Sequence, residues 1–462
     1  MIGTIEPPQG PDARRPPPGP DAPRLSRCLG PGTATSVVVA NMIGTGIFTT
    51  TGLMLDRLES GWLVIACWLA GGLIATCGAL CYAELATLMP RAGAEYAYLH
   101  EIYGPLAGFL TGWISFFVGF SAPIAATGVA VVAYLTAARL LPDTPVVGKG
   151  VAILIVLALT FLHAAGLRAG TTVQNTLTIL KLVLLGGLLA AGFAAGAGDW
   201  SFLGPTSGFW ATGRPGGIGL ALLWVMFAFS GWNAAAYLAE EVERPERTLP
   251  RALLFGTGTV TVLYLSLNLL FFFAAPAEEL AGEIAVGETA TRHLFGPEAA
   301  PFLSVLIGAA LLSSLSAYVL IGPRVYYAMA RDRLFLPFAA RVHPRLGTPA
   351  ASILLQGACA SILILLGSFD QLLTYIGFSL GIFPMMAVAG LIIMRRREPH
   401  RPRPYRVPAY PFVPLIYLGA GLIILVIAFV NRPWPSLMAI LTVAAGIPVY
   451  WIAARRGLLG GR

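Results

Sequence analysis

Two glycine-containing stretches interrupt long apolar runs, and they are the parts of the chain best suited to binding a ligand. The first run, VVVANMIGTGIFTTTGLML, has Gly44, Thr45 and Gly46 in its middle. The sixth, LLWVMFAFSGWNAAAYLAEE, has Ser230 and Gly231 there. Glycine lowers the cost of unwinding a helix, and free N–H and C=O groups at such a break could bind a zwitterion's carboxylate and ammonium. Close helix packing through small residues is the alternative explanation.

The two interruptions also occupy matching places in the chain. They fall five apolar runs apart, as corresponding segments of two halves would. Unwound backbone at membrane depth is tolerated only where it lines a cavity, and paired broken segments are typical of solute carriers. The pattern predicts a solute-binding cavity between the two runs, with Phe227 and Trp232 as walls and the Asn233 side chain as a hydrogen-bonding group.

Lys181 is the second unusual feature, because it lies inside the fifth apolar run. That run begins near Thr172, which puts Lys181 about 13 Å along the helix. A charge at this depth costs about 3 kcal/mol or more and is a functional hypothesis by default. Gln174, Thr178 and Lys181 recur at i, i+4 and i+7, so they give the helix one polar face. Two interpretations stay open: an ammonium that takes part in the function, fixed or proton-exchanging, or one that only ties helices together.

Other polar residues have weaker cases. Glu84 lies near the inner end of the second run, where it could form an inner-gate ion pair with Arg324. His163 in the fourth run could relay protons, although a lone histidine is more often a packing residue. Cys77 and Cys81 have helical spacing but no further ligands nearby, so we expect packing residues and no metal site.

Catalytic motifs are missing from the sequence. It contains no Ser/His/Asp set, phosphate-binding loop, metal cluster or nucleotide fingerprint, so we expect neither an enzyme nor a cofactor. No acidic residue is expected near either interruption, and a cationic solute would therefore lack a counter-charge. This absence favours small or medium neutral solutes.

The amino-acid composition indicates what kind of secondary structure positions these residues. Of the 462 residues, 56% are hydrophobic and 11% are charged, whereas soluble domains carry about 25% charged residues. This excludes an ordinary soluble globule and predicts an all-α protein that crosses a membrane repeatedly. Twelve apolar runs are expected to span it, at residues 34–55, 61–83, 105–137, 150–166, 173–196, 216–238, 252–275, 300–321, 350–367, 372–394, 412–430 and 435–454.

Basic residues are unevenly distributed between these runs. With the N-terminus inside, 23 of the 30 Lys and Arg residues fall in inner segments. We therefore expect both termini in the cytoplasm, in a protein of the cell membrane. The same distribution explains the net charge of +8 without a nucleic-acid partner. Residues 1–32, rich in Pro, Gly and Arg, are predicted to be a disordered cytoplasmic tail and not a cleaved signal.

Several stretches resemble the amino acid–polyamine–organocation superfamily of transporters, and within it the L-type amino acid transporter branch and its prokaryotic relatives. The matching stretches are IGTGIF (43–48), YAELATLMPRAGAEYAYLHEIYGPLAGFLTGW (82–113), VQNTLTILKL (173–182), FAFSGWNAAAYLAEEVERPERTLPRAL (227–253) and GPRVYYAMARDRLFLPFAARVHPRLGTPA (322–350). The resemblance implies a LeuT-type fold of twelve helices with discontinuous helices 1 and 6. It implies inverted repeats at 33–196 and 197–394, and two extra helices with a cytoplasmic C-terminus at 395–462.

The resemblance also implies alternating access to a central amino-acid site formed by the two interruptions. Gly44, Thr45 and Gly46 would donate hydrogen bonds to the substrate carboxylate. The substrate ammonium would be held by backbone carbonyls, those of Met42, Ile43, Phe227, Ala228 and Ser230. Phe227 matches an aromatic residue that closes over the substrate, and so would act as a gate.

Lys181 also has a counterpart in the family. Sodium-coupled proteins with this fold hold a sodium ion between helices 1 and 8, where sodium-independent relatives place a lysine from helix 5. By resemblance Lys181 would face the Gly44 carbonyl and a serine hydroxyl, that of Ser314 or alternatively Ser313. We therefore expect sodium-independent amino-acid transport, with uniport, exchange and proton symport all open.

A covalent partner is not expected. Animal L-type members bond to a glycoprotein through a cysteine in the outer loop between helices 3 and 4. Here that loop reads ARLLPDTPVVGKG, so no disulfide-linked heavy chain is predicted, and the sequence does not define the oligomeric state. Two alternatives stay open: a carrier of cationic amino acids or polyamines, and a membrane amino-acid sensor that does not transport. The short tails argue against a sensor.

Overall fold

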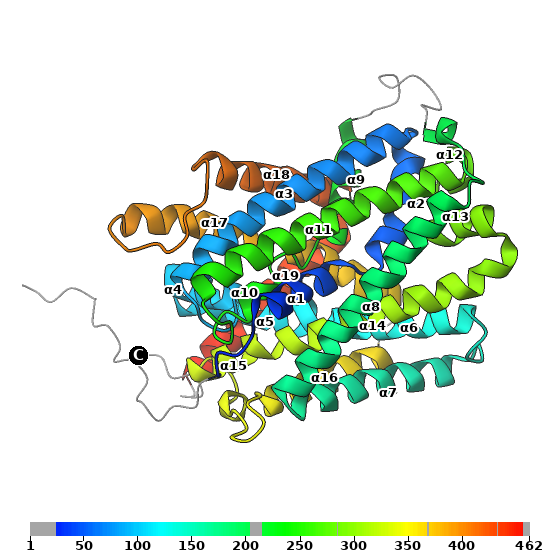
Figure 1. Cartoon of the computed structure of the whole chain (residues 1–462). Helices are drawn as coiled ribbons and strands as arrows, with labels where there is room; N and C mark the ends of the chain where they lie inside the picture. Colours follow the sequence, from blue (N-terminus) through cyan, green and yellow to red (C-terminus); the bar gives the residue numbers. More distant parts are fainter. Residues whose placement is uncertain (1–24, 204–214, 284, 367–368, 432, 456–462) are drawn as a thin grey trace, which may run out of the picture.

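The chain folds into a bundle of helices. The structure is a computed structural model of the 462 residues, and it describes residues 25–203, 215–283, 285–366, 369–431 and 433–455. Within these ranges the regular structure is helical, apart from one β-bridge between Leu29 and Val242. Figure 1 shows long helices packed side by side along one direction. The all-α class predicted from composition is therefore confirmed.

The helices have the following bounds in chain order. The first half contains α1 Pro31–Met42, α2 Gly46–Leu58, α3 Gly61–Leu88, α4 Glu95–Tyr103, α5 Pro105–Ile114, the π-helical η1 Ser115–Ser121, α6 Ala122–Ala137, α7 Pro145–Ala164 and α8 Leu167–Ala194. The second half contains η2 Trp200–Leu203, α9 Pro215–Ala228, α10 Ala234–Tyr237, α11 Pro245–Ala274, α12 Ala277–Leu280, α13 Val286–Phe295, η3 Pro297–Ala299, α14 Ala300–Ile321, α15 Pro323–Arg331, η4 Pro337–Ala340, α16 Ala350–Leu366, α17 Phe369–Arg397, α18 Phe412–Asn431 and α19 Pro433–Arg455.

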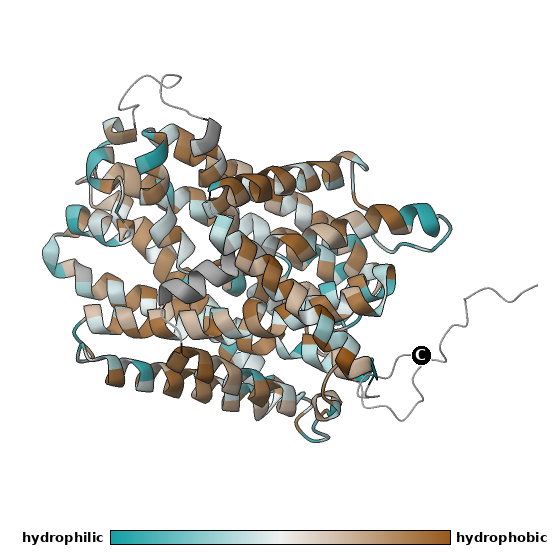
Figure 2. Cartoon of the chain, turned by 180° about the vertical axis from the view of Figure 1, so that it is seen from behind, coloured by the Kyte–Doolittle hydropathy of each residue, from teal (hydrophilic) through white to brown (hydrophobic). Residues whose placement is uncertain are grey.

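Many of these helices could cross a membrane. In the described ranges, eight are long and apolar enough to do so, and the bent pair α1 and α2 makes a ninth span. Figure 2 shows hydrophobic residues along most of each long helix and hydrophilic residues at the connections. The described residues thus support a polytopic membrane protein, whereas the predicted count of twelve crossings stays a proposal. The apolar helices α9 and α16 have only 14 and 17 residues.

Local sequence explains where several helices begin and bend. Pro31, Pro105, Pro145 and Pro245 each stand at the start of a helix, where a missing N–H and a fixed φ cost nothing. The predicted run 105–137 has the same bounds in the structure, as α5, η1 and α6 together. Its middle is π-helical, a distortion that is frequent at functional sites.

The prediction that residues 1–32 form a disordered tail is wrong for the part from Leu25 onward. Residues 1–24 lie outside the described residues, but Leu25 and Leu29 are buried. The amides of Cys28 and Leu29 both donate to the Glu241 carbonyl at 2.9 Å, and the Glu243 amide donates to the Leu29 carbonyl at 2.9 Å. The chain is therefore ordered from Leu25, because this short segment pairs with the backbone that follows α10.

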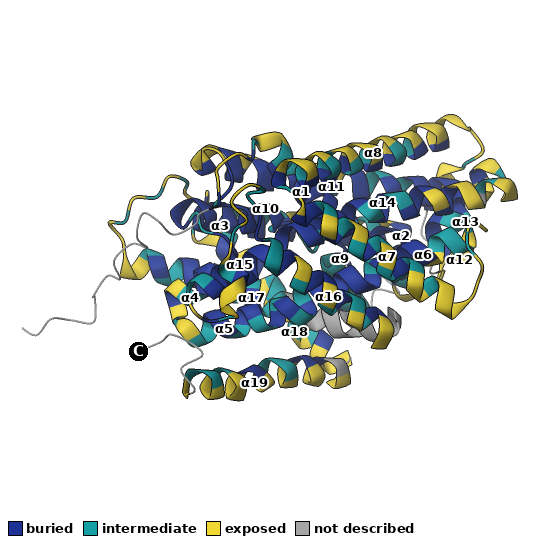
Figure 3. Cartoon of the chain, turned by 90° about the horizontal axis from the view of Figure 1, so that it is seen from below, coloured by how far each residue is buried: buried dark blue, intermediate teal, exposed yellow. Residues whose placement is uncertain are grey.

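Helix α1 lies at the centre of the bundle (Figure 1), where it packs against α8, α10, α11 and α14. Figure 3 shows buried residues on α1, α10 and α11 and long exposed stripes on α8 and α19 at the edges. In an apolar stretch of 18 residues in α19, only 11% of the residues are buried, compared with 78% in the corresponding stretch of the segment Pro297–Arg331. Such an exposed apolar helix suits contact with lipid. The core therefore surrounds the interrupted first span.

Candidate functional site

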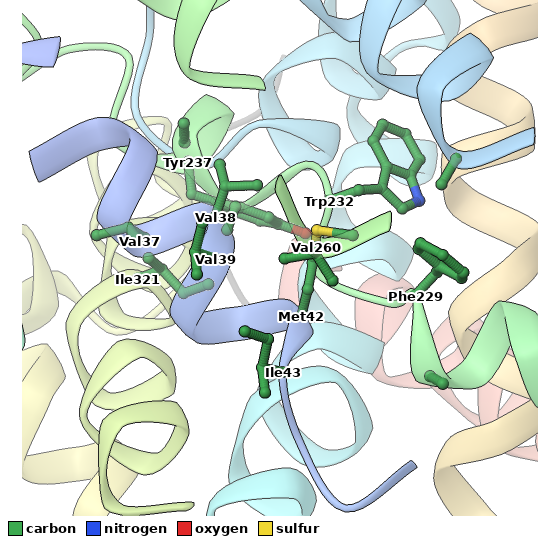
Figure 4. Packing of buried hydrophobic residues seen from close by; sticks show 14 of the residues in the cluster. Val37, Val38, Val39, Met42, Ile43, Phe229, Trp232, Tyr237, Val260 and Ile321 are labelled. Carbon is green, nitrogen blue, oxygen red and sulfur yellow. The ribbon is translucent and has the colours of Figure 1, made fainter. Parts of the chain in front are cut away.

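Both predicted interruptions are present. Helix α1 ends at Met42 and α2 begins at Gly46, with a bend of 41° between them. Helix α9 ends at Ala228, and the chain then turns irregularly until α10 begins at Ala234. Each break leaves backbone groups without partners inside the helix. Figure 4 shows the end of α1 at Met42 and Ile43, with Phe229 and Trp232 of the second break nearby.

Glycine is required where the two interruptions touch. A Cβ atom on Gly46 would lie 2.8 Å from the Cβ atom of Ala228, at the end of α9. A Cβ atom on Gly231 would lie 2.4 Å from Oδ1 of Asn41, in the last turn of α1. Gly231 also has a φ of +97°, a conformation that side-chain-bearing residues rarely adopt. Small residues thus allow close packing here, as the alternative explanation required, but the breaks also open on a cavity.

That cavity has a volume of about 210 Å³ and lies between the two interruptions. It is lined by most of the residues predicted for the site, namely Met42, Gly44, Thr45, Gly46, Phe227, Ala228, Ser230, Trp232, Asn233 and Ser314. The π-helical segment η1 contributes Ser115, Gly119 and Phe120 to the same wall. The predicted residues Ile43, Lys181, Ser313, Glu84 and Arg324 do not line it.

Lys181 lies beside the cavity, fully buried, at the end of α1. Its Nζ atom donates to the carbonyls of Ile43 at 2.8 Å and Ala40 at 3.1 Å, and to Oγ of Ser314 at 2.8 Å. The interruption frees these carbonyls, and the negative end of the α1 dipole favours a cation there. The expected contact with the Gly44 carbonyl is wrong by one residue, whereas the contact with Ser314 is confirmed.

Ser313 is not a partner of Lys181. Its hydroxyl lies 3.2 Å from Oγ1 of Thr178, and its carbonyl accepts from Nε2 of Gln174 at 3.3 Å. The predicted polar face of α8, formed by Gln174, Thr178 and Lys181, is therefore buried against α14. This face ties α8 to α14 along one side of the broken span.

The Ile43 carbonyl is a poor acceptor for a substrate. It accepts from both Lys181 and Ser314, the latter at 2.6 Å, and a carbonyl oxygen has two lone pairs. The carbonyls of Met42 and Ala228 keep capacity, because each accepts from a single hydroxyl, that of Tyr264. The prediction that Ile43 receives an ammonium conflicts with this geometry.

Tyr264 links the two interruptions and was not predicted. Its hydroxyl lies 2.6 Å from the Met42 carbonyl and 3.0 Å from the Ala228 carbonyl. The phenol is fully buried in α11 beside Phe229. A recurrent polar stripe in the seventh apolar run was the signal, since Thr257, Thr261, Tyr264 and Asn268 are spaced by three or four residues.

Glu95 is a second residue that the sequence did not indicate. It begins α4, is 3% exposed and lines the cavity. Its carboxylate accepts a hydrogen bond from Nδ2 of Asn233, directly after the second break. The expectation that no acidic residue stands near either interruption is therefore wrong, because α4 folds back against a segment about 140 residues later in the chain. The Tyr237 and Tyr417 side chains line the same region.

The predicted gate pair is also wrong, since Glu84 and Arg324 have other partners. Glu84 is buried and accepts from Nε of Arg395 at 2.9 Å and from the Val407 amide at 2.7 Å. Arg324 forms a buried two-pronged pair with Glu241, at 2.8 and 3.0 Å. Glu84 thus holds the end of α17 and the loop after it, whereas Arg324 holds the segment after α10.

The aromatic and histidine candidates divide into cavity and packing residues. Phe227 and Trp232 line the cavity, as predicted. Phe229 instead packs against Trp68 and Tyr264, with ring centroids 5.9 and 5.1 Å away. Nε2 of His163 lies 2.8 Å from Oγ of Ser316, away from the cavity. This position fits the packing interpretation.

Comparison with known proteins gives one consistent family. The family model described as "Amino acid permease" matches residues 29–452. Among curated relatives, the "Serine/threonine exchanger SteT" of Bacillus subtilis is 32% identical over 428 residues, 92% of this chain and 96% of the relative. The "Asc-type amino acid transporter 1" of Mus musculus is 29% identical over 93% of this chain and 81% of its own.

A third relative, the "Large neutral amino acids transporter small subunit 2" of Oryctolagus cuniculus, is 30% identical over 93% of this chain and 80% of its own. All three matches extend over most of both proteins. They therefore include the interrupted helices and the cavity between them.

Proposed function

Because the chain belongs to the amino acid permease family, we propose that it is a sodium-independent secondary transporter of amino acids that works by alternating access. The observation that carries this proposal is the contact between two interrupted helices that line one cavity. We propose further a LeuT-type fold of twelve crossings, with repeats at 33–196 and 197–394. Both termini would lie in the cytoplasm and the protein in the cell membrane, because most Lys and Arg residues fall in segments that are then on the inner side.

Backbone groups at the interruptions would recognise the amino-acid zwitterion. The N–H groups of Gly44, Thr45 and Gly46 stand at the start of α2, where its dipole favours an anion. The Thr45 hydroxyl would add a donor to the substrate carboxylate. The carbonyls of Met42 and Ala228, each with spare capacity, would take the ammonium.

Lys181 supports transport without sodium. Its ammonium already occupies the space between α1, α8 and α14 and satisfies the carbonyls of Ala40 and Ile43. A sodium ion at the same position would need those oxygens and would meet the positive charge. We therefore propose that the fixed ammonium replaces a coupling ion at the end of α1.

The relatives' names favour a neutral substrate. One is described as a serine/threonine exchanger and another as a transporter of large neutral amino acids. We propose that small or medium neutral L-amino acids are carried, by exchange or with a proton. Glu95 in the cavity wall is the observation that favours the second candidate, a carrier of cationic amino acids or polyamines.

No disulfide-linked heavy chain is proposed, because the 138–150 segment lacks cysteine.

Uptake into proteoliposomes tests this proposal. The purified protein should take up one or more of L-alanine, L-serine, L-threonine and L-leucine, equally well with sodium or choline as the external cation. Vesicles preloaded with unlabelled amino acid should take up label faster than empty ones if transport is an obligatory exchange. Flux that requires sodium, or uptake of putrescine and L-arginine alone, would contradict the proposal.

A further inference from the structure

The Glu95 carboxylate has one satisfied oxygen and one unsatisfied oxygen. Oε1 accepts a hydrogen bond from the Tyr82 hydroxyl at 2.8 Å and another from Nδ2 of Asn233. Oε2 is buried and has no hydrogen-bond partner among the described residues. Glu95 is also part of the cavity wall, together with Asn233. The cavity therefore contains a buried carboxylate oxygen that lacks a partner.

No described cation neutralises this carboxylate. Helix α4 packs against α5, α15 and α17. Arg396 of α17 is exposed, and the other arginines of α15 and α17 are engaged elsewhere. Arg324 pairs with Glu241, Arg331 with Glu240, Arg395 with Glu84, and Arg397 donates to the Ile102 carbonyl. Arg91, which precedes α4, pairs with Asp332.

The remaining titratable groups around Glu95 are mostly phenols. The Tyr82 hydroxyl donates to the Glu95 carboxylate, and the side chains of Tyr98, Tyr237 and Tyr417 lie close enough to interact electrostatically with it. On α4 itself, His100 lies 4.0 Å from Asp332, and Glu101 is exposed. None of these groups supplies a positive charge to the buried carboxylate. A buried charge without a partner is unfavourable and is relieved by taking up a proton.

The hydrogen bonds indicate which oxygen would hold the proton. Oε1 already accepts two hydrogen bonds, so it acts as the carbonyl oxygen of a neutral carboxyl group. Oε2 is then the hydroxyl oxygen, and its hydrogen can serve a solute in the cavity. Burial raises the pKa of the Glu95 carboxyl above its ordinary value, and the hydrogen bonds that it accepts offset only part of this rise.

We propose that Glu95 is a proton-binding residue of the cavity, and that an amino acid binds together with one proton on Oε2. The proton comes from bulk water when the solute enters and returns there when the solute leaves. The solute displaces the water that would otherwise solvate an ionised Oε2, so its binding favours the neutral carboxyl. This inference rests on the proposed function and makes the transport proton-linked.

Binding measurements at several pH values test the inference. Calorimetric titration of the purified protein with L-alanine, L-serine, L-threonine and L-leucine, in phosphate and in Tris, gives the affinity and the number of protons taken up. In the wild type the Kd should rise as pH increases above the pKa of Glu95, by up to about tenfold per pH unit. Proton uptake should approach one per bound amino acid over the same range.

Two variants separate this effect from other titrations. Glu95→Gln keeps an acceptor and a donor in place of the protonated carboxyl, so its Kd should be nearly independent of pH and its proton uptake should vanish. Glu101→Gln removes a carboxylate from the same helix at an exposed position and should behave as the wild type. If Glu95→Gln does not fold, the proton uptake of the wild type decides alone.

The results that overturn the inference are distinct from failure of the proposed function. Amino-acid binding that is independent of pH in the wild type, or equal proton uptake in Glu95→Gln, overturns the inference alone. Tight binding of L-arginine with proton release also overturns it, because Glu95 would then be an ionised counter-charge. Failure of every tested amino acid to bind contradicts the proposed function and the inference with it.

Discussion

The Nζ atom of Lys181 lies 2.8 Å from the carbonyl oxygen of Ile43, the first residue after α1 ends. A helix end leaves its last carbonyls without partners, and at membrane depth no water is at hand to satisfy them. The ammonium supplies donors to Ile43 and Ala40 and reaches Ser314 on α14. The break and the buried charge therefore compensate each other, and neither would be favourable alone.

Removal of the ammonium should abolish or uncouple transport. In Lys181→Ala the carbonyls of Ala40 and Ile43 lose a donor, which costs about 1–3 kcal/mol of stability for a buried group left unsatisfied. We expect protein in the membrane but no amino-acid uptake in proteoliposomes. Lys149→Ala is the matched control, because Lys149 is exposed and donates only to the Leu365 carbonyl. Wild-type uptake by Lys181→Ala would leave Lys181 only the role of tying helices together.

A methyl group between the interruptions should weaken substrate binding. In Gly46→Ala the added Cβ atom would lie 2.8 Å from the Cβ atom of Ala228, and such overpacking costs about 1–3 kcal/mol. The two breaks must then move apart, so we expect a higher Kd and a lower melting temperature. Gly258→Ala has open space around the added atom and should leave both values unchanged. Equal behaviour of the two variants would mean that this contact does not shape the site.

The Thr45 hydroxyl should contribute directly to affinity. Thr45 lines the cavity, and Thr45→Val keeps its shape but removes the donor. A hydrogen bond to a charged group contributes about 1.5–3 kcal/mol, so the apparent substrate constant should rise by about 10- to 100-fold. Thr49→Val is the control, because the Thr49 side chain does not line the cavity and its hydroxyl donates to the carbonyl of Thr45, the residue before α2. An unchanged constant in Thr45→Val would show that the hydroxyl makes no substrate contact.

Local sequence was sufficient to locate the interruptions and the buried charge. Glycines inside apolar runs predict breaks wherever they fall, and the helical spacing of Gln174, Thr178 and Lys181 predicts a shared face. These signals act within one helix, so they do not depend on how the helices pack. The bounds of the long third run, 105–137, were correct for the same reason.

Contacts between distant segments could not be predicted in this way. Glu95 reaches Asn233 only because α4 folds back against the second break, and Tyr264 bridges the breaks only because α11 packs on α1. The partner of Glu84 was wrong for a related reason. A buried carboxylate in an apolar helix predicts a cationic partner but does not identify it among the many arginines of the inner segments.

We therefore expect Glu84 to contribute to the stability of the fold more than to gating. It is fully buried and accepts from Arg395, while Nε of Arg403 lies 3.3 Å from Oε1 and the Val407 amide also donates to it. Glu84→Gln removes the charge between two arginines, and loss of one partner of a buried pair costs about 3–5 kcal/mol. We expect a clearly lower melting temperature and faster proteolysis of the loop between α17 and α18.

An exposed pair in the same region provides the control for this effect. Glu398 and Arg401 form an ion pair with side chains 48% and 30% exposed, and such surface pairs contribute about 0–1 kcal/mol. Glu398→Gln should therefore shift the melting temperature little. Because Arg324 is held by Glu241 and not by Glu84, Glu84→Gln should leave substrate affinity near the wild-type value. A large rise in Kd without loss of stability would instead restore Glu84 as a gate residue.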